Sequence, residues 1–421
     1  MLKGLRIFFL GILMVSGVSL SLGADTIRCS TVEVFKRNAL VQPDAIMRKQ
    51  QLESDIRHWI VQNATKRENG IQAAVTIPVV VHVVYNTEAQ NISEAQIQSQ
   101  IDRLNKDFSN SNADKLLSTQ PFFNLTGNAK LEFCLTRTDP DGNATSGITR
   151  TQTALASFSD NNDVKFSARG GADAWDATQY LNIWVCNLGG NLLGYAQFPS
   201  QLATQPETDG VVIGYKYFGT IGTVVPPYNS GRTATHEIGH WLNLEHIWGD
   251  DNDCSGTDHV ADTPDQERET IGCPSGIRTD NCTGTSPGVM YQNYMDYTDD
   301  ACMVLFTKGQ VDRMNAVLDI VRPEIIATDK CSRTTGLAVQ NNRRLKIYPN
   351  PIQNYLTIEG LPGTKAGYFI IDIFNALGEK VYTTEISSDA MIEMATLKTG
   401  TYVMNIYNDD FSVTKKLTVL K

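Results

Sequence analysis

The sequence is short of positive charge and of long apolar runs. Its 421 residues include 36 lysines and arginines against 46 aspartates and glutamates, which gives a net charge of -10. Such an acidic balance argues against nucleic acid as the main partner. The only apolar run of near-membrane length is Ile7–Leu22, which follows Lys3 and Arg6 and precedes small residues. This order is typical of a signal peptide, so we expect residues 1–24 to be cleaved off and the mature protein to contain no transmembrane segment.

Histidine is scarce too, and half of it lies in one stretch. Three of the six histidines fall within the sequence HEIGHWLNLEH, residues 236–246. Residues four apart share a helix face, so His236 and His240 can bind one metal ion with Glu237 beside it. His246 lies too far along for a straight helix, so the helix must end and the chain must turn before it. Three histidine ligands leave one tetrahedral zinc position open for water, as in catalytic zinc sites.

This arrangement predicts hydrolysis. Zinc lowers the pKa of a bound water to roughly 7, and a nearby carboxylate can take a proton from that water as it attacks a polarised carbonyl. Glu237 is placed for this role of general base. The alternative is a buried amphipathic helix whose histidines bond to backbone groups, but such a helix has no use for an acidic residue beside the first histidine.

The extended motif resembles that of the metzincin clan of zinc endopeptidases. Asn243 stands where metzincins usually carry glycine, and asparagine is the commonest other residue in the left-handed conformation that this turn favours. Residues 293–297 resemble the methionine turn of the clan. Met295 would then form a hydrophobic base beneath the histidines, and the hydroxyl of Tyr297 would help to stabilise the tetrahedral intermediate. Without the histidines, this stretch would be interpreted as the end of a buried strand.

Residues 25–67 are polar and helix-prone, and we interpret them as a propeptide. They contain Cys29, which lies outside every later group of cysteines. A thiolate is a strong zinc ligand, so Cys29 can fill the open position and hold the enzyme latent, as the cysteine switch of metzincin relatives does. A lipid-modified, unpaired or disulfide-bonded cysteine is the alternative. Lys66 and Arg67 would suit an activating cut by a protease specific for basic residues.

The folded region begins near Ile77. Residues 77–85 form a β-branched apolar run that is typical of a buried strand. A helix follows, because Ser93 and Gln96 have capping-box spacing and apolar residues recur on one face through Phe108. We also expect strands at 131–136 and 181–186, an edge strand for extended substrate at 194–199, and a closing helix at 307–321.

Four of these features together resemble the pappalysin family of metzincins, and within it the secreted proteases of the ulilysin and mirolysin type. They are the opening strand and helix, residues 181–184, the zinc motif running into residues 247–250, and residues 293–297. The resemblance covers residues 77–323. It implies an α+β catalytic domain over residues 68–331, with a mixed twisted sheet, an active-site helix and a backing helix, and it implies protein or peptide substrates.

An acidic segment follows the zinc motif. Clustered carboxylates with hydroxyl and carbonyl oxygens suit Ca²⁺, which takes oxygen ligands, although the spacing is not that of an EF-hand. A solvated acidic loop is the alternative. The family's calcium site falls on this segment, and the resemblance places the ligands at Asp258, Asp262, Thr263 and Glu267.

Four of the eight cysteines lie in the same irregular region, and four cysteines allow three pairings. The resemblance implies two disulfides: Cys254–Cys282 and Cys273–Cys302. Cys134 and Cys186 lie in predicted strands, where we expect buried thiols. Cys331 is left without an assignment.

The resemblance also bears on specificity. Members of this type that cut before arginine or lysine carry an acidic residue near the methionine turn, at the floor of the S1′ pocket. The position three residues before Met295 is Gln292 here. The sequence therefore does not predict a preference for arginine or lysine in the S1′ pocket, although the amide oxygen of Gln292 can accept a hydrogen bond from a basic side chain.

The C-terminal part has a different character. Residues 332–342 are polar and predict a linker, and residues 343–421 hold short alternating runs that predict a small all-β sandwich. Its opening at 346–351 and its ending at 415–421 resemble the C-terminal sorting domain of the type IX secretion system. This resemblance implies export through the periplasm to the cell surface or medium, with the type IX machinery as a partner. A carbohydrate- or protein-binding sandwich is the alternative.

Two functions follow from these observations. The first is a secreted zinc endopeptidase that is made as a latent zymogen. The second is a non-catalytic surface adhesin on a metalloprotease scaffold. Glu237 favours the enzyme, because an adhesin does not require a general base at that position.

Overall fold

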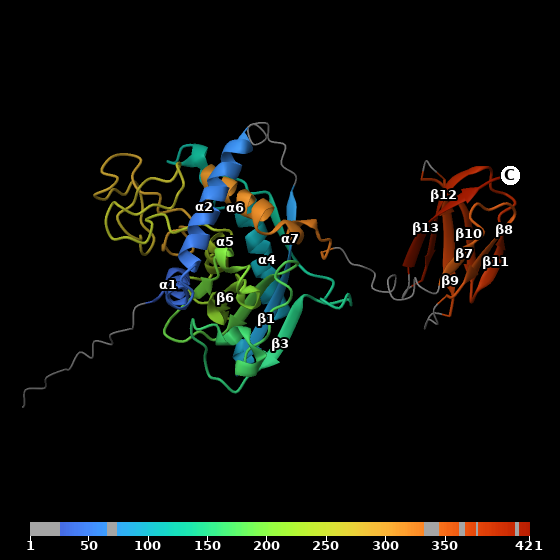
Figure 1. The fold of residues 1–421 in the computed structure, drawn as a ribbon, viewed down its shortest axis with the longest axis horizontal. Helices are drawn as coiled ribbons and strands as arrows, with labels where there is room; N and C mark the ends of the chain where they lie inside the picture. The colour runs from blue at the N-terminus through green and yellow to red at the C-terminus, as the bar shows by residue number, and fades with distance from the viewer. Residues whose placement is uncertain (1–25, 65–73, 332–344, 362–366, 376–377, 409–411) are drawn as a thin grey trace, which may run out of the picture.

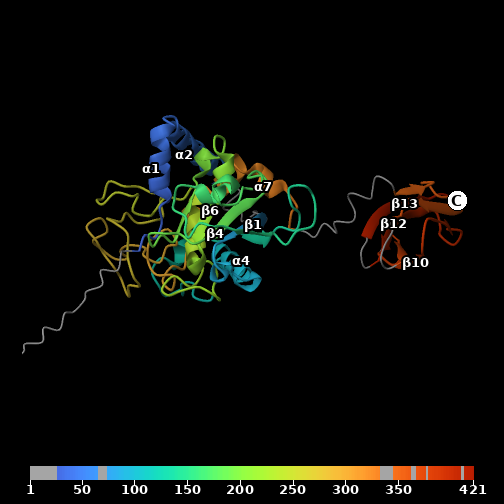
Figure 2. The ribbon, with the colours of Figure 1, turned by 90° about the horizontal axis from the view of Figure 1, so that it is seen from below.

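The computed structural model describes residues 26–64, 74–331, 345–361, 367–375, 378–408 and 412–421. The expected signal peptide at 1–24, the expected linker at 332–342 and the expected activating cut at Lys66 and Arg67 lie outside these residues. Within them, the helices are all too short or too polar to span a bilayer. Figures 1 and 2 show a helix-and-sheet region followed by an all-β region.

The first region is built on a mixed sheet with the strand order β2-β1-β4-β6-β5. Strand β1 pairs in parallel with β2, β3 and β4, and β4 pairs in parallel with β6. The last strand, β5, is antiparallel to β6 and forms one edge of the sheet. The strands are β1 (Val75–Tyr85), β2 (Leu131–Leu135), β3 (Ile148–Gln152), β4 (Leu181–Cys186), β5 (Gly194–Ala196) and β6 (Val211–Gly214). The predicted α+β fold with a mixed sheet is confirmed.

Strand β1 explains why the sheet forms where it does. Its β-branched residues Val79, Val80, Val81 and Val83 have no exposed surface, so both of its faces are covered, as expected of the central strand of a parallel sheet. The only histidine in this strand, His82, is also buried and stacks on Trp184.

Four helices pack with this sheet: α4 (Glu94–Phe108), α5 (Arg232–Trp241), α6 (Lys308–Ile320) and α7 (Pro323–Ala327). Ser93 caps α4 by accepting a hydrogen bond from the amide of Gln96, as predicted. Thr307 and Gln310 form the predicted capping box of α6. That helix ends at Ile320, and Pro323 begins the short helix α7 instead of ending α6 directly. Short 3-10 helices occupy loops at Glu88–Gln90, Phe123–Leu125, Asp163–Lys165, Ser167–Arg169, Pro199–Gln201, Pro206–Thr208 and Tyr215–Tyr217.

Two further helices come from the segment expected to be a propeptide: α1 (Thr31–Val41) and α2 (Ala45–Gln62). Helix α2 lies beside α6 (Figure 1), and its residues Leu52 and Ile56 belong to the same buried cluster as the sheet and the zinc-motif helix. The segment therefore packs as part of the globular region.

The disulfides agree with the expected pairing in the acidic region and correct it elsewhere. Cys254 bonds to Cys282 and Cys273 bonds to Cys302. The prediction of a buried thiol at Cys134 is wrong, because Cys134 bonds to Cys331. The chain after α7 returns to the sheet there, where the amide of Arg137 donates to the carbonyl of Lys330 at 2.8 Å. Cys186 is a buried free thiol, as predicted.

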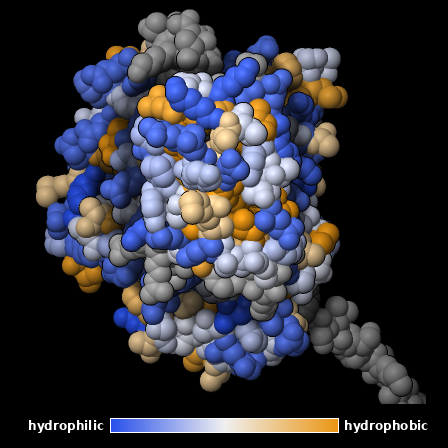
Figure 3. Space-filling view, turned by 90° about the vertical axis from the view of Figure 1, so that its right-hand side faces the viewer, coloured by the Kyte–Doolittle hydropathy of each residue, from blue (hydrophilic) through white to orange (hydrophobic). Residues whose placement is uncertain are grey.

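The C-terminal region is the predicted all-β sandwich, with sheets in the orders β10-β9-β12-β13 and β11-β8-β7. The strands are β7 (Lys346–Tyr348), β8 (Tyr355–Glu359), β9 (Phe369–Phe374), β10 (Lys380–Ile386), β11 (Ala390–Glu393), β12 (Gly400–Tyr407) and β13 (Ser412–Val419). Strands β8, β10 and β11 were not predicted. Strands β8 and β11 are only five and four residues long, and β10 holds four polar residues among seven, so their hydrophobic signal is weak. On the face of the protein drawn in Figure 3, hydrophobic residues form small groups between hydrophilic ones.

Candidate active site

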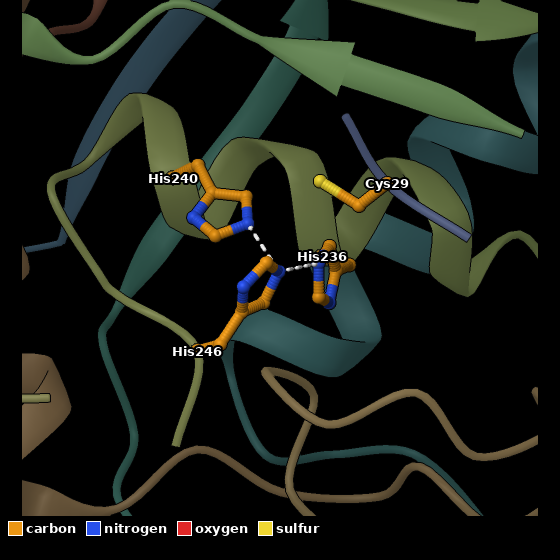
Figure 4. A group of neighbouring side chains, drawn as sticks. All are labelled: Cys29, His236, His240 and His246. Carbon is orange, nitrogen blue, oxygen red and sulfur yellow. Dashed lines mark hydrogen bonds between the residues drawn. The ribbon is translucent and has the colours of Figure 1, made fainter. Parts of the chain in front are cut away.

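Helix α5 carries the first two histidines of the motif and ends where the sequence predicts a turn. His236 and His240 are one helical turn apart, on the same face (Figure 4). The helix ends at Trp241, and Asn243 then takes a left-handed conformation with a φ of 64°. The amide of Leu244 donates back to the carbonyl of Gly239 at 2.9 Å, which closes the turn. The predicted left-handed role of Asn243 is confirmed.

This turn brings the third histidine back to the helix. Nε2 of His246 lies 3.1 Å from Nε2 of His240 and 3.3 Å from Nε2 of His236, and all three rings are buried. Figure 4 shows the three rings facing a common point, two of them from the helix and one from the loop after it.

The opposite nitrogen of each ring is held by an acceptor. Nδ1 of His236 lies 2.7 Å from the carbonyl of Tyr294, and Nδ1 of His240 lies 2.7 Å from the carbonyl of Leu244. Nδ1 of His246 lies 2.6 Å from a carboxylate oxygen of Asp250. Because each Nδ1 donates a hydrogen, the lone pair of Nε2 in the neutral form of each ring points to the common point.

The donor set fits a zinc ion. Burial, together with the neighbouring rings, lowers the pKa of His236 and of His240 well below the ordinary range, so these rings are neutral. Burial acts in the same direction on His246, but Asp250 outweighs it and raises the pKa of that ring. Converging lone pairs repel one another unless a cation lies between them. Zinc binds neutral imidazole nitrogens in this arrangement.

The thiol of Cys29 completes the cluster. Its Sγ and the three histidine nitrogens all lie within 4.8 Å of one another, and Figure 4 shows the thiol directed at the rings. Burial and the Glu237 carboxylate raise the pKa of this thiol well above its usual value. A thiolate at this position therefore requires a cation beside it. Within the described part of the chain, this is the only group of three or more His, Cys, Asp or Glu side chains close enough to hold a metal ion.

Glu237 directs its carboxyl group to the same place. Its Oε2 accepts a hydrogen bond of 2.9 Å from the hydroxyl of Thr31 and lies 3.4 Å from Sγ of Cys29. Its Oε1 is buried and has no hydrogen-bond partner among the described residues. Burial raises the pKa of Glu237 to about 7, which lies in the range useful for a general base.

The methionine turn lies under the helix. A Cβ atom on Gly239 would collide with Sδ of Met295, so the glycine lets the helix pack closely against the methionine side chain. The ring of Tyr297 lies 4.8 Å from that of His246, and its hydroxyl lies 3.5 Å from the carbonyl oxygen of Cys29. Both residues thus lie where the resemblance places them.

The segment before α1 occupies the edge strand. Ile27 pairs in parallel with Leu192, and the amide of Ser30 donates to the carbonyl of Gly194 at 3.3 Å. The amide of Ala196 donates to the hydroxyl of Thr31 at 2.8 Å. The edge that was predicted to bind substrate is therefore covered by the chain's own N-terminal segment.

The pocket next to Cys29 holds Arg28. Its guanidinium lies 3.3 Å from Oδ1 of Asp300 and 4.6 Å from the centre of the Tyr228 ring; Arg28 and Asp300 are buried, and Tyr228 is half-buried. Gln292 is not its partner, because the buried Oε1 of Gln292 has no hydrogen-bond partner among the described residues. The sequence analysis missed Asp300 and Thr31. The arginine next to Cys29 was the signal that could have led to a search for an acidic partner.

The residues expected to bind calcium do not converge. Oδ2 of Asp258 accepts a hydrogen bond of 2.8 Å from the hydroxyl of Thr263. Asp262 instead accepts from the amide of Gly309 at 2.9 Å, and Glu267 pairs with Arg268 next to it. Calcium binding by this set stays a prediction.

Comparison with known proteins gives two family matches. Residues 166–319 match the family profile described as pregnancy-associated plasma protein-A, and residues 346–420 match the secretion system C-terminal sorting domain. An extracellular metalloprotease of Arthroderma benhamiae is 33% identical over 249 residues, which is 58% of this chain and 78% of that protein. An extracellular metalloprotease of Pyricularia oryzae is 32% identical over 324 residues, 73% of this chain and 94% of that protein.

Solved structures are also similar. A mutant of Tannerella forsythia promirolysin has a TM-score of 0.66 and 52% identity, and the match covers 71% of this chain and 97% of that chain. Mature mirolysin of the same organism, in complex with a cleaved peptide, has a TM-score of 0.61 and 58% identity, with 62% of this chain and 99% of that chain covered.

Proposed function

This chain belongs to the pregnancy-associated plasma protein-A, or pappalysin, family; we propose that it cleaves peptide bonds with a zinc ion bound by His236, His240 and His246 and with Glu237 as the general base. It is a secreted or cell-surface metalloendopeptidase with a C-terminal sorting domain. Three Nε2 atoms that face one point, beside a buried carboxyl group, support this assignment.

The chain's own residues supply the rest of the mechanism. Zinc, when bound, would polarise the substrate carbonyl and acidify a water. Glu237 takes the proton of that water as it attacks the carbonyl carbon, and then passes the proton to the leaving amine nitrogen. The hydroxyl of Tyr297 donates a hydrogen bond to the oxyanion that develops on the carbonyl. The main chain of β5 holds the extended substrate by strand addition.

The N-terminal segment would keep the precursor inactive. Cys29 would take the fourth position at the zinc ion, and its neighbours cover β5, where substrate would bind. Because Ile27 pairs in parallel with Leu192, the segment runs in the same direction as this strand. A substrate that pairs antiparallel to β5 would run the opposite way, so the segment fills the cleft without presenting a peptide bond in the substrate's direction.

The pocket that holds Arg28 indicates a substrate preference. Oδ2 of Asp300 is occupied by the amides of Ser230 and Arg232, which leaves Oδ1 for the guanidinium of Arg28. After the N-terminal segment leaves, Asp300 would be a buried carboxylate without its partner. We propose that this pocket is S1′ and that it takes arginine or lysine from the substrate.

Several features of the precursor are part of the same proposal. Residues 1–24 would be a signal peptide, 25–67 a propeptide, 68–331 the catalytic domain, 332–342 a linker and 343–421 the sorting domain recognised by type IX machinery. Structural Ca²⁺ would bind in the acidic segment by drawing together Asp258, Asp262, Thr263 and Glu267, of which only Asp258 and Thr263 are in contact here. Equilibrium dialysis with Ca²⁺ tests this site, because loss of the Asp258 carboxylate should abolish tight binding of the ion.

The substitution Glu237→Ala tests the mechanism. The variant should retain zinc in stoichiometric amount and lose about 100-fold to 10,000-fold in the rate of peptide hydrolysis, the range that a general base contributes. Glu132→Ala, on the exposed side of β2, is the matched control and should leave the rate unchanged. Full activity of the Glu237→Ala protein would contradict the mechanism. A library of peptides should be digested by the wild-type enzyme. If the wild-type enzyme bound zinc but cleaved none of these peptides, the adhesin alternative would be restored.

A further inference from the structure

Helix α2 reaches the turn between the second and third histidines from behind the active site. Oε1 of Glu53 accepts hydrogen bonds from Nη2 of Arg313 at 2.6 Å and from Nδ2 of Asn243 at 2.7 Å. Glu53 is 7% exposed and Arg313 is 1% exposed. Asn243 is the left-handed residue that directs the chain towards His246, so Glu53 is hydrogen-bonded to a side chain within this turn.

A second ion pair holds the other end of the same turn. Nζ of Lys49 lies 2.8 Å from Oε1 of Glu245, the residue directly before His246. The same ammonium lies over the rings of Phe35 and Phe198, at 4.7 Å and 4.1 Å from their centres. Lys49 and Glu53 are four residues apart, so they share one face of α2, and this face is complementary in charge to the turn.

Arg313 needs the carboxylate that α2 provides. Its other hydrogen bonds go to the backbone carbonyls of His259 and Asn243. Although burial acts in the opposite direction, Arg313 lowers the pKa of Glu53, so this carboxyl group is ionised. Without Glu53, the guanidinium would lose its hydrogen-bonded carboxylate inside the protein, which is strongly unfavourable.

Further contacts join α2 to the rest of the globular region. Leu52 and Ile56 of α2 belong to the main buried cluster, and the indole nitrogen of Trp59 donates to Asp319 of α6 at 3.1 Å. Figure 1 shows α2 beside α6. None of these residues is a member of the cluster formed by Cys29 and the three histidines. The N-terminal segment therefore has two separate docking parts, residues 27–31 in the cleft and α2 behind the turn.

We propose that Arg313 and Asn243 form a carboxylate-binding exosite in the mature enzyme, and that α2 is its ligand and remains bound noncovalently after the chain is cut. This inference rests on the proposed function, in which residues 25–67 are a propeptide. Binding of α2 holds Asn243 and Glu245 and so positions the loop that carries His246. The exosite recognises an amphipathic helix with a glutamate four residues after a lysine, next to an apolar stripe.

The test is binding of a synthetic peptide with the sequence of residues 43–64 to the processed, zinc-loaded Glu237→Ala enzyme from which the cut N-terminal segment has been removed. This enzyme cannot digest the peptide, and the peptide lacks Arg28, Cys29 and Thr31. Isothermal titration calorimetry should show saturable binding with one site. A peptide with Glu53→Gln should bind about 30-fold more weakly, because it leaves a buried charge without its partner. The Asp55→Asn peptide, which removes a carboxylate outside this contact, should bind like the wild type.

Three results would overturn the proposal: no saturable binding of the wild-type peptide, equal binding of the wild-type and Glu53→Gln peptides, or equal weakening by Glu53→Gln and Asp55→Asn. Binding of the peptide does not require hydrolysis, so this experiment and the test of the proposed function are independent. An enzyme that binds the peptide but cleaves no substrate would contradict the proposed function and leave the exosite standing.

Discussion

The hydroxyl of Thr31 donates a hydrogen bond of 2.9 Å to Oε2 of Glu237 and accepts one of 2.8 Å from the main-chain amide of Ala196. One side chain of the N-terminal segment thus connects the proposed general base to the edge strand. This contact ties up the carboxylate that would take the proton from water. The hydroxyl of Thr31 makes this contact itself, so the proposed latency would have a second component in addition to Cys29 at the zinc ion.

Replacing Thr31 should weaken latency. Thr31→Val keeps the shape of the side chain and removes its hydroxyl, so Glu237 loses a charge-assisted hydrogen bond. We expect the precursor to mature or to hydrolyse peptide about tenfold faster, in line with the strength of such a bond. The measurement is the initial rate of peptide cleavage by freshly purified precursor. Thr31→Ser retains the hydroxyl and should behave like the wild type; if both variants matched the wild type, the hydroxyl would have no role.

Cys29→Ala should have a larger effect than Thr31→Val. Among the described residues, it removes the only thiol near the three histidines, and it would free the fourth position at a bound zinc ion for water. We expect peptide cleavage by the uncut precursor, measured as above. Cys186→Ala is the matched control, because Cys186 is also a buried free thiol but is not a member of the histidine cluster. An uncut Cys29→Ala precursor that stayed inactive would show that the rest of the segment suffices to block the cleft.

Asp300 should decide the preference for basic residues. Asp300→Asn removes the negative charge that now pairs with Arg28, so substrates with arginine at P1′ should lose about 30-fold or more in kcat/KM relative to substrates with leucine. The ratio of the two values is the measurement, because it does not depend on the fraction of active enzyme. Gln292→Leu tests the residue that the sequence analysis chose and should leave the ratio unchanged. If Gln292→Leu lowered the ratio and Asp300→Asn left it unchanged, Gln292 would be the residue at the floor of the pocket.

The zinc site could be predicted because its geometry is local. The helical period places His236 and His240 on one face, and the left-handed turn at Asn243 follows from the chemistry of asparagine. The contacts that complete the site are not local. Arg28 and Asp300 are separated by 272 residues, so no periodicity connects them. Counting back from Met295 led to Gln292, whereas the acidic partner of Arg28 lies five residues after Met295.

The fold shows the same limit. Buried strands such as β1 and β4 were predicted from their apolar runs, because burial on both faces leaves a continuous hydrophobic signal. The bond between Cys134 and Cys331 joins residues 197 positions apart, and the sequence holds no pattern that pairs them. The ion pair between Glu53 and Arg313 is likewise a contact between a helix expected to be removed and the last long helix of the catalytic region. Tertiary packing, not local chemistry, determines such pairs.

His82 should make stability depend on pH. Burial lowers the pKa of this ring from 6.5 to about 4, although Asn182 accepts a hydrogen bond from it at 3.0 Å and so favours the charged form. Between these pH values the unfolded chain binds a proton that the native protein does not bind, so the free energy of unfolding falls as the pH falls. The full effect is about 3 kcal/mol.

The variant His82→Gln tests this dependence, because it has no titrating group at this position. In urea unfolding, the wild type should therefore lose about 3 kcal/mol relative to this variant between about pH 7.5 and about pH 4. A difference between the two proteins that stayed constant over this range would show that His82 is protonated equally in the folded and unfolded states.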